Sequence, residues 1–355
     1  MKVGRKGNAK WNFSETFTWS SPGFDLNDMG YMKETDYLMN ETEIMYRQTD
    51  IWKIFRYNAF TLSQKNMWNF GGTPFSNNAS LRWQSMTMNR YEWDVKETFA
   101  WNWLDSRLLR GGPDVRFGSY FLTSAKFNTD KAKRMMFMLK YEGDHNFEGN
   151  RFNTISPSLT FRLGNHVYLS GQLDYAWNTD EMQYVATTSP LSSSSLAPYY
   201  YVMGHMDQKT YGLTLKLQVN VTPDISIQFY GAPFTSIAKY DDFKLAADTK
   251  SHTFENRFQR IDPDQLTYAD GVYTIGEGAG QMPFRNPDFR FNEFRSNLVA
   301  RWEYLPGSTL YFVWEHRMSN RDNWYSSGWG SNLDRMWGLP ATNTFMIKMN
   351  YWFNL

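Results

Sequence analysis

The sequence contains no cysteine and no long apolar run. Without cysteine, the chain can form neither a disulfide framework nor a thiolate metal site, and it has no cysteine nucleophile. The longest purely apolar runs, such as Met135–Leu139, span about five residues, whereas a membrane-spanning helix needs about 20. These absences exclude a disulfide-stapled scaffold and a membrane protein built from helices.

An excess of charge of one sign is also missing. The 355 residues include 37 Lys and Arg against 36 Asp and Glu, which gives a formal net charge of +1. A surface that binds phosphate normally carries a basic excess. We therefore expect no nucleic acid among the partners.

Motifs for catalysis and cofactors are missing as well. None of the five histidines stands in the H-E-x-x-H or H-x-x-x-H spacing that holds zinc, and no G-x-S-x-G elbow occurs. Gly276–Gly280 is glycine-rich but follows no strand–helix pattern, which favours a flexible loop. His316 follows Glu315, but adjacent strand residues point to opposite faces. We predict no catalytic residue, no cofactor and no metal ion.

Aromatic residues, in contrast, are abundant: 18% of the chain, with 15 Trp and 22 Tyr. Trp and Tyr concentrate where an apolar surface meets water. The dominant pattern has period two, so that between Thr210 and Val221 every odd position is apolar and every even position is polar or glycine. The same alternation recurs at 159–177, 225–230, 297–304, 309–315 and 344–355. It predicts β-strands with one apolar and one polar face.

The predicted connections alternate between short and long. Several strands reach about ten residues, the length of a tilted membrane strand, whereas globular strands average about five or six. Short turns are predicted near 48–50, 89–91, 128–133, 164–165, 222–224 and 305–308, and long loops near 20–40, 64–77, 105–114, 143–155, 178–208, 231–294 and 318–342. Short turns at one rim and long loops at the other are typical of outer-membrane barrels.

We therefore predict an all-β fold, a transmembrane antiparallel up-and-down β-barrel that forms a single domain over residues 1–355 of a bacterial outer membrane. Six turns and seven loops connect about 14 strands, with 12–16 strands or part of a larger barrel as alternatives, and both termini lie at the short-turn, periplasmic rim. A soluble double sheet is the competing interpretation, because a second sheet over each apolar face would produce the same alternation.

The C-terminal segment places Phe345, Ile347, Met349, Tyr351 and Phe353 on one face. An alternating last strand that ends in aromatics resembles the recognition strand of outer-membrane barrels, which implies the barrel-assembly machinery as a partner. Membrane lipids and lipopolysaccharide are the other expected partners. Residues 7–19 show a matching pattern, interrupted by Glu15, and pairing of the first and last strands would remove both exposed sheet edges.

Charged side chains of both signs fall on the polar register and are expected to face the lumen. These candidates are Arg82, Lys96, Lys126, Lys140, Arg162, Asp174, Lys216, Arg301, Glu303, Glu315 and Lys348. Two interpretations remain open: a water-filled lumen whose charges filter solutes, and a lumen cross-braced by ion pairs and closed to passage.

Aromatic residues near the predicted strand ends are expected in the girdles at the membrane interfaces. They are Trp103, Tyr175, Trp177, Tyr304, Tyr351 and Phe353. Aromatic platforms for sugar rings are the alternative. The longest predicted loop, 231–294, holds many Asp, Tyr and Phe residues, and we expect it to form a constriction or a surface for a protein partner. Calcium is a further alternative there, although the EF-hand spacing is absent.

Three stretches resemble a known family, in the same order along the chain. They are 21–31 (SPGFDLNDMGY), 294–311 (FRSNLVARWEYLPGSTLY) and 343–353 (NTFMIKMNYWF). The family is catalogued as domain of unknown function 5916, is rich in Bacteroidota, and its members are often labelled membrane-associated hydrolases. The resemblance implies an outer-membrane barrel. It also implies that this chain corresponds to the C-terminal barrel portion of longer members, whose N-terminal domain is similar to carbohydrate-binding modules.

The expected function is therefore that of a porin-like channel, an uptake component or an envelope scaffold. A membrane-embedded hydrolase, which the family label suggests, is the first alternative. A non-catalytic barrel that binds a partner through its long loops is the second.

Overall fold

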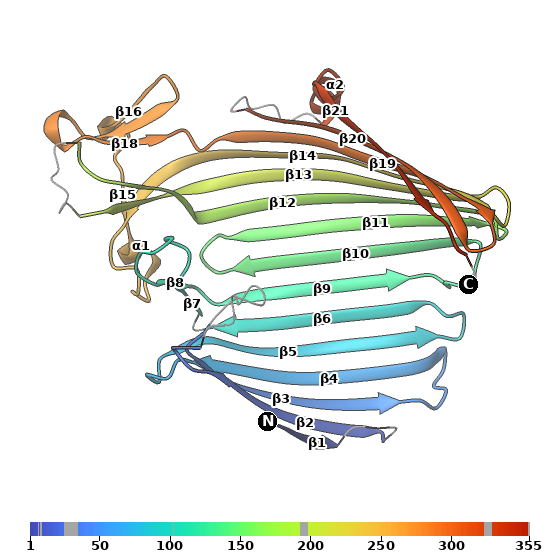
Figure 1. Ribbon diagram of the computed structural model, residues 1–355. Coiled ribbons are helices and arrows are strands. Elements are labelled where there is room, and N and C mark those ends of the chain that lie inside the picture. The colour runs from blue at the N-terminus through green and yellow to red at the C-terminus, as the bar shows by residue number, and fades with distance from the viewer. Residues whose placement is uncertain are drawn as a thin grey trace.

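The computed structural model describes residues 1–5, 7, 9–24, 35–101, 103–191, 198–322 and 329–353. The protein is all-β, with a principal antiparallel sheet of 16 strands that follow one another almost entirely in chain order (Figure 1). The strands on this path are β1 (Lys2–Arg5), β2 (Trp11–Ser20), β3 (Tyr37–Gln48), β4 (Phe55–Trp68), β5 (Pro74–Thr87), β6 (Glu92–Trp101), β9 (Tyr120–Asn128), β10 (Met135–Asn146), β11 (Arg151–Leu163), β12 (Val167–Thr188), β13 (Tyr200–Asn220), β14 (Ile225–Ala246), β19 (Phe289–Leu305), β20 (Ser308–Asp322) and β21 (Ala341–Asn350).

The remaining elements lie in the connections. β15 (Phe258–Arg260) pairs with β14, and β7 (Trp103–Asp105) pairs with β8 (Val115–Phe117). β16 (Leu266–Ala269), β17 (Val272–Ile275) and β18 (Met282–Arg285) form a three-stranded sheet, and the helices are α1 (Phe254–Arg257), α2 (Trp329–Trp337) and the short 3-10 turns η2 (Pro263–Gln265) and η3 (Gly278–Gly280). No helix in the described ranges is both long and apolar enough to cross a membrane.

The period-two alternation predicted the strands and their faces correctly. On β12 and β13, Leu169 lies opposite Leu217, while the polar Gln172 lies opposite Thr214. Directly opposed residues of an antiparallel pair point to the same side, so each register row is either apolar or polar. The predicted turn between β19 and β20 places Gly307 at a φ of +80°, a conformation that glycine adopts without strain.

All six predicted short turns lie at one end of the sheet, which we call the short-turn end; they occupy 49–54, 88–91, 129–134, 164–166, 221–224 and 306–307. At the opposite, long-loop end, the loops predicted at 64–77 and 143–155 are wrong. β4 continues to Trp68 and β5 begins at Pro74, and only residues 147–150 separate β10 from β11. Polar residues occupy both faces near these turns, so the alternation stops before the strands do.

The three longest predicted loops are also shorter than expected. β12 extends to Thr188, β13 begins at Tyr200, and β14 extends to Ala246, so that 178–208 and 231–294 are largely strand. β20 likewise reaches Asp322, and α2 lies within 318–342. The extended ends of β12, β13 and β14 pack against other elements, which explains their irregular alternation.

These extended ends form a compact unit at the long-loop end, which we call the cap (103–117, 180–191, 198–206 and 237–288). The rest of the principal sheet we call the body. Figure 1 shows β7, β8, α1 and β15 to β18 gathered around one end of the sheet. The cap has two apolar clusters, one around Phe243 and Phe284 and the other around Leu109 and Met203, all of which are buried.

The sheet is not closed into a ring by the described residues. β1 folds back along β2, with Lys2 opposite Thr16, and occupies the edge of β2 that the last strand would need. The N-terminal amine donates to the Phe17 carbonyl, so the N-terminus lies beside the sheet and not at the short-turn end as predicted. β21 pairs only with β20 among the described strands, and all ten of its residues are exposed.

Candidate functional site

The polar face of the body carries the residues that the sequence predicted for a lumen. Cross-strand register places Arg82 opposite Lys96, Asp94 opposite Lys126, and Lys126 opposite Lys140. The same register continues across the sheet to Lys348. All of the predicted candidates share this face: Arg82, Lys96, Lys126, Lys140, Arg162, Asp174, Lys216, Arg301, Glu303, Glu315 and Lys348.

Ion pairs and hydrogen bonds connect part of this face. Arg82 forms an ion pair with Asp94, and Lys140 Nζ lies 2.8 Å from Glu142 Oε1. Arg301 Nη2 lies 2.5 Å from Glu303 Oε2. These contacts link residues of the same or neighbouring strands, so they stiffen the wall without bridging the space in front of it.

Other cations on the polar face are not paired. Lys96, Lys126, Lys216 and Lys348 have no carboxylate within ion-pair distance in the described part of the chain. The face therefore combines braced pairs with lysines that remain available to a solute. This mixture matches neither of the two interpretations of the lumen completely.

The polar face ends in a cavity beneath the cap, with a volume of about 480 Å³. Its walls come from β5, β6, β9, β10, β11, β12 and the β7–β8 hairpin. The hairpin contributes Trp103 and Phe117, which face polar side chains of the sheet such as Asp144 and Asn178. A volume of this size lies within the range of about 300–1,000 Å³ that is common for small-molecule sites.

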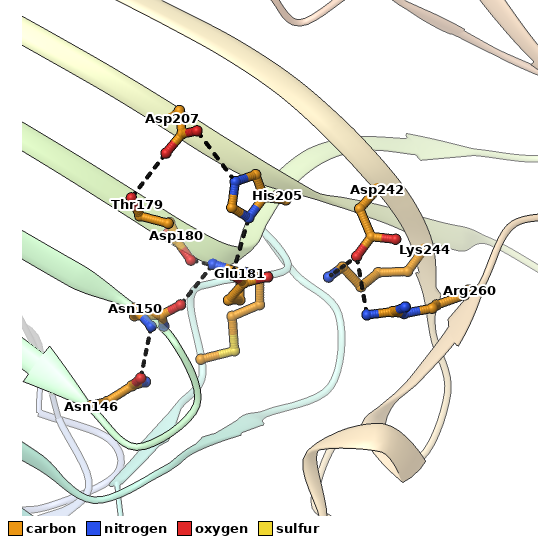
Figure 2. A network of polar contacts seen from close by, with 11 residues as sticks. Asn146, Asn150, Thr179, Asp180, Glu181, His205, Asp207, Asp242, Lys244 and Arg260 are labelled. Carbon is orange, nitrogen blue, oxygen red and sulfur yellow. Dashed lines mark hydrogen bonds and ion pairs between the residues drawn. The ribbon is translucent and has the colours of Figure 1, made fainter. Parts of the chain in front are cut away.

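A β-bulge in β12 shapes one side of the cavity (Figure 2). Asp180 Oδ1 accepts a hydrogen bond from Met182 N at 2.9 Å, and Asn150 Oδ1 accepts one from Glu181 N at 2.6 Å. Asn146 Oδ1 accepts from Asn150 N at 2.8 Å. The turn between β10 and β11 is thus tied to the bulge, which fixes the positions of Asn146 and Asn150 at the cavity.

Burial changes the acid–base properties of the carboxyl groups here. Burial raises the pKa of Asp180, against the hydrogen bond from Met182 that lowers it. Burial also raises the pKa of Asp144, and the charge of Asp180 raises it further. Both carboxyl groups therefore hold protons more tightly than exposed aspartates.

His205 lies on the other side of the bulge, among carboxylates (Figure 2). Its Nδ1 is 3.1 Å from Glu181 Oε1 and its Nε2 is 3.6 Å from Asp207 Oδ2. Burial lowers the pKa of His205, but the hydrogen bond to Glu181 and the charges of Glu181, Asp207 and Asp241 outweigh it, so the pKa is raised. The imidazole can therefore carry a positive charge close to neutral pH.

A buried cation lies deeper in the cap. Lys244 is 1% exposed, and its Nζ lies 3.3 Å from Asp242 Oδ2, which Arg260 also approaches at 3.5 Å. The Lys244 ammonium lies 5.7 Å and 5.9 Å from the ring centroids of Phe254 and Phe258. These contacts account for its charge within the cap and leave no role for it in the cavity.

The predicted interface aromatics occupy several environments. Tyr175 stacks on Trp177 at 5.2 Å and on Tyr211 at 4.9 Å, all on the apolar face of the body. Trp103 lies instead in the β7–β8 hairpin, where its ring meets Tyr120 edge-on at 5.8 Å and lines the cavity. The others are at the short-turn end: Tyr304, Tyr351 and Phe353.

Sequence reasoning missed Asp144, Asn178, Asp180 and His205 as site residues. All four fall in segments predicted to be loops, and their proximity depends on a strand register that the alternation does not fix there. The loss of alternation around 178–208 was the available signal. In the described ranges no group of three or more His, Asp or Glu side chains is arranged to hold a metal ion.

Comparison with known proteins assigns the chain to a protein family. The family described as Domain of unknown function (DUF5916) matches residues 2–355. No curated protein and no solved structure matches the chain. The family match confirms the resemblance carried by the three sequence stretches.

Proposed function

The chain belongs to this family of unknown function, and we propose that its body is the wall of a β-barrel in a bacterial outer membrane that passes small hydrophilic solutes. The polar face would line the water-filled lumen, and the apolar face would contact lipid. The cap would stand outside the membrane at the mouth of the barrel.

The observation that carries this proposal is the inverted burial of the body. Leu62 and Leu81 lie directly opposite each other and are 55% and 58% exposed. One residue further along, Ser63 and Ser80 lie opposite each other, their hydroxyls are 2.6 Å apart, and Ser80 is only 5% exposed. Soluble proteins seldom expose large contiguous apolar surfaces, whereas membrane barrels require one.

The extent of the apolar face supports the same proposal. On β12 it runs over 167–177, and a membrane strand needs about 9–11 residues. In the register row of Trp177, polar groups interrupt the outward face on β6 to β11: Glu97 accepts a hydrogen bond from Thr123, and Asn153 Oδ1 accepts one from Tyr141. The same row stays apolar on β4 and β5, at Leu62 and Leu81. We place the upper boundary of the membrane at Trp177 on β12 and at Gly143 on β10, so that Asp144, Asp180 and His205 lie outside it.

Closure of the wall is part of the proposal. An open sheet edge in a bilayer would leave backbone amides and carbonyls without partners. The edges at β1 and β21 must therefore be covered in the membrane, either by pairing with each other after β1 moves or by pairing with further strands.

The absence of cysteine permits a direct test with single-cysteine variants. Leu169 and Ser170 are neighbours on β12 that point to opposite faces. In lipid vesicles, Leu169→Cys should react with a lipid-soluble maleimide but not with a charged thiol reagent, and Ser170→Cys should react with the charged reagent. The unmodified chain provides a background without thiols. Equal reaction of both variants with the charged reagent would contradict a lipid-facing surface.

Conductance tests the passage of solutes separately. Purified protein in planar bilayers should give ion currents, and reaction of Ser170→Cys with the charged reagent should reduce them. The same treatment of Leu169→Cys should leave them unchanged. If the protein inserted into the membrane but gave no current, it could still form the barrel wall, but the proposed channel would be wrong.

The two alternative functions have weaker support. A hydrolase would need a serine or a carboxylate beside a histidine. No described serine hydroxyl donates to a histidine, and His205, which lies beside Glu181 and Asp207, is not among the residues that line the cavity. A partner-binding barrel would use the cap, where no described feature yet specifies a protein. The solute channel therefore remains the proposal.

A further inference from the structure

The cavity beneath the cap has two chemically different walls. One wall is aromatic and comes from Trp103 and Phe117 of the hairpin, with Tyr120 edge-on to Trp103. The sheet side carries polar side chains at the ends of β5, β10 and β12, together with the apolar Ala100, Leu122 and Phe152. Such a division suits a ligand with one apolar and one polar surface.

The polar wall contains groups that lack hydrogen-bond partners within the protein. The side chains of Asn78 and Asn178 make no hydrogen bond to any described residue, and the Asp144 carboxylate accepts none. All three are only partly exposed. Their polar atoms are not shut off from solvent, so water or a ligand in the cavity supplies the hydrogen bonds that the protein does not.

The chemistry of the three groups narrows the ligand. An asparagine amide offers both donors and an acceptor, and a carboxylate offers acceptors. Sugar hydroxyls both donate and accept, whereas the C–H groups of a pyranose ring form an apolar face that packs on aromatic rings. Asp105, Asp144 and Asp180 contribute negative charge to the lining, against Arg151 alone, which disfavours an anionic ligand.

We propose that this cavity binds a neutral saccharide, with the sugar ring against Trp103 and its hydroxyls bonded to Asn78, Asn178 and Asp144. The site lies at the cap end of the polar face, so under the proposed function it would select solutes before they enter the barrel. Binding itself does not depend on a conducting pore, and it can be tested on the full chain in detergent.

Figure 2 shows hydrogen bonds that tie the turn between β10 and β11 to the bulge of β12, beside the polar wall. The Asn146 side chain holds the 147–150 turn through hydrogen bonds to Glu148 N at 2.9 Å and Asn150 N at 2.8 Å. Asn150 in turn accepts from the bulge at Glu181. Preformed positions reduce the entropy that is lost when a ligand is bound.

The experiment is a calorimetric titration of the detergent-solubilised full chain with maltotriose, cellotriose and chitotriose. At least one should bind, and Trp103→Ala and Asn178→Ala should each weaken it about tenfold or more, the change expected when a central contact is removed. The matched control is Trp177→Ala, because Trp177 precedes Asn178 on β12 but lies on the apolar face. The control should bind as the unmodified chain does.

Defined results would overturn the proposal. Binding of none of the three saccharides would reject it, and so would binding that is unchanged in both Trp103→Ala and Asn178→Ala. Tighter binding of trigalacturonate or of choline would replace a neutral sugar with a charged ligand. Saccharide binding without bilayer current would support this site and contradict the channel. Current without saccharide binding would support the channel and contradict this site.

Discussion

The body and the cap of this protein bury opposite kinds of side chain. In the cap, Phe243 and Met203 are 5% and 0% exposed, as in an ordinary soluble core. In the body, Leu81 and Trp302 are 58% and 50% exposed, while Ser80 and Thr98 are buried. The two regions share the strands β12, β13 and β14. The comparison shows that a single strand can change its surroundings along its length, and that the pattern of its side chains changes at the same point.

The largest expected effect is in the core of the cap. Phe243 contacts Tyr273 at 4.9 Å and Phe284 at 5.0 Å between ring centroids. Phe243→Ala should destabilise the cap by about 3–5 kcal/mol, because it leaves a cavity that cannot refill. Under the proposed function, Phe312→Ala on the apolar face of the body should cost less than about 1 kcal/mol in a bilayer, because lipid chains would replace the lost contacts. Hydrogen exchange of residues 237–246 would measure the loss of stability in Phe243→Ala, and that of residues 308–317 the loss in Phe312→Ala. Equal costs would mean that the two regions do not differ as described.

A second variant tests whether the cap is held to the sheet by charge. Arg257 is fully buried, forms an ion pair with Glu148, and also donates to the Arg116 carbonyl. Arg257→Met should destabilise the cap by about 3–5 kcal/mol, because the largely buried Glu148 carboxylate would lose its counter-charge and keep only the hydrogen bond from Gly118 N. The double variant with Glu148→Gln should recover part of this loss. The rate of limited proteolysis within 247–260 would report the loss of cap stability. A cleavage rate that is unchanged in Arg257→Met would show that the ion pair does not hold the cap.

Sequence alone predicted the body far better than the cap. The alternation of 210–221 and the Pro306–Gly307 turn predicted strands and turns that the structure confirms, because one regular surface imposes one regular pattern. The ends of β12 to β14 were missed because their neighbours come from distant segments. Lys2–Arg5 carries no alternating signal, so its position on the edge of β2 could not be predicted. The cavity depends on register between separate strands, which places Asn178 near Asp144 only once the sheet is formed.

A charged substitution should separate the two faces of the body. Leu173→Arg would place a guanidinium on the apolar face near the middle of the 167–177 span and should destabilise the protein in lipid vesicles by about 2–4 kcal/mol. Gln172→Arg, one residue earlier on the polar face, should cost much less. Guanidinium titration of folding in vesicles would compare them. If both variants lost the same stability, the apolar face would not be in contact with lipid.

The smallest expected effect is the pH dependence at the boundary between the two regions. Burial lowers the pKa of His205, but Glu181, Asp207 and Asp241, which face the imidazole, raise it by more than burial lowers it. A histidine whose pKa is higher in the folded than in the unfolded state stabilises the fold fully below its unfolded value of about 6.5. This contribution is lost as the pH rises through the folded pKa. Protection of the β12–β13 ends from hydrogen exchange should therefore decrease above that pH, after correction for the intrinsic exchange rate.

The variant His205→Gln isolates this contribution, because glutamine keeps a hydrogen-bond donor for Glu181 but does not titrate. The loss of protection with rising pH should disappear in it. His316→Gln is the matched control, because His316 lies in the body and its Nδ1 is 2.8 Å from the Asn343 amide oxygen, not from a carboxylate. A pH dependence that persists in His205→Gln would assign it to another group, with Asp180 and Asp144 as the nearest candidates. Their raised pKa values have the same sign, because a buried aspartate also loses stability as the pH rises, but from its unfolded value near 3.9 upward. The two windows begin more than two pH units apart, so a titration from pH 4 to 9 distinguishes the histidine from the aspartates.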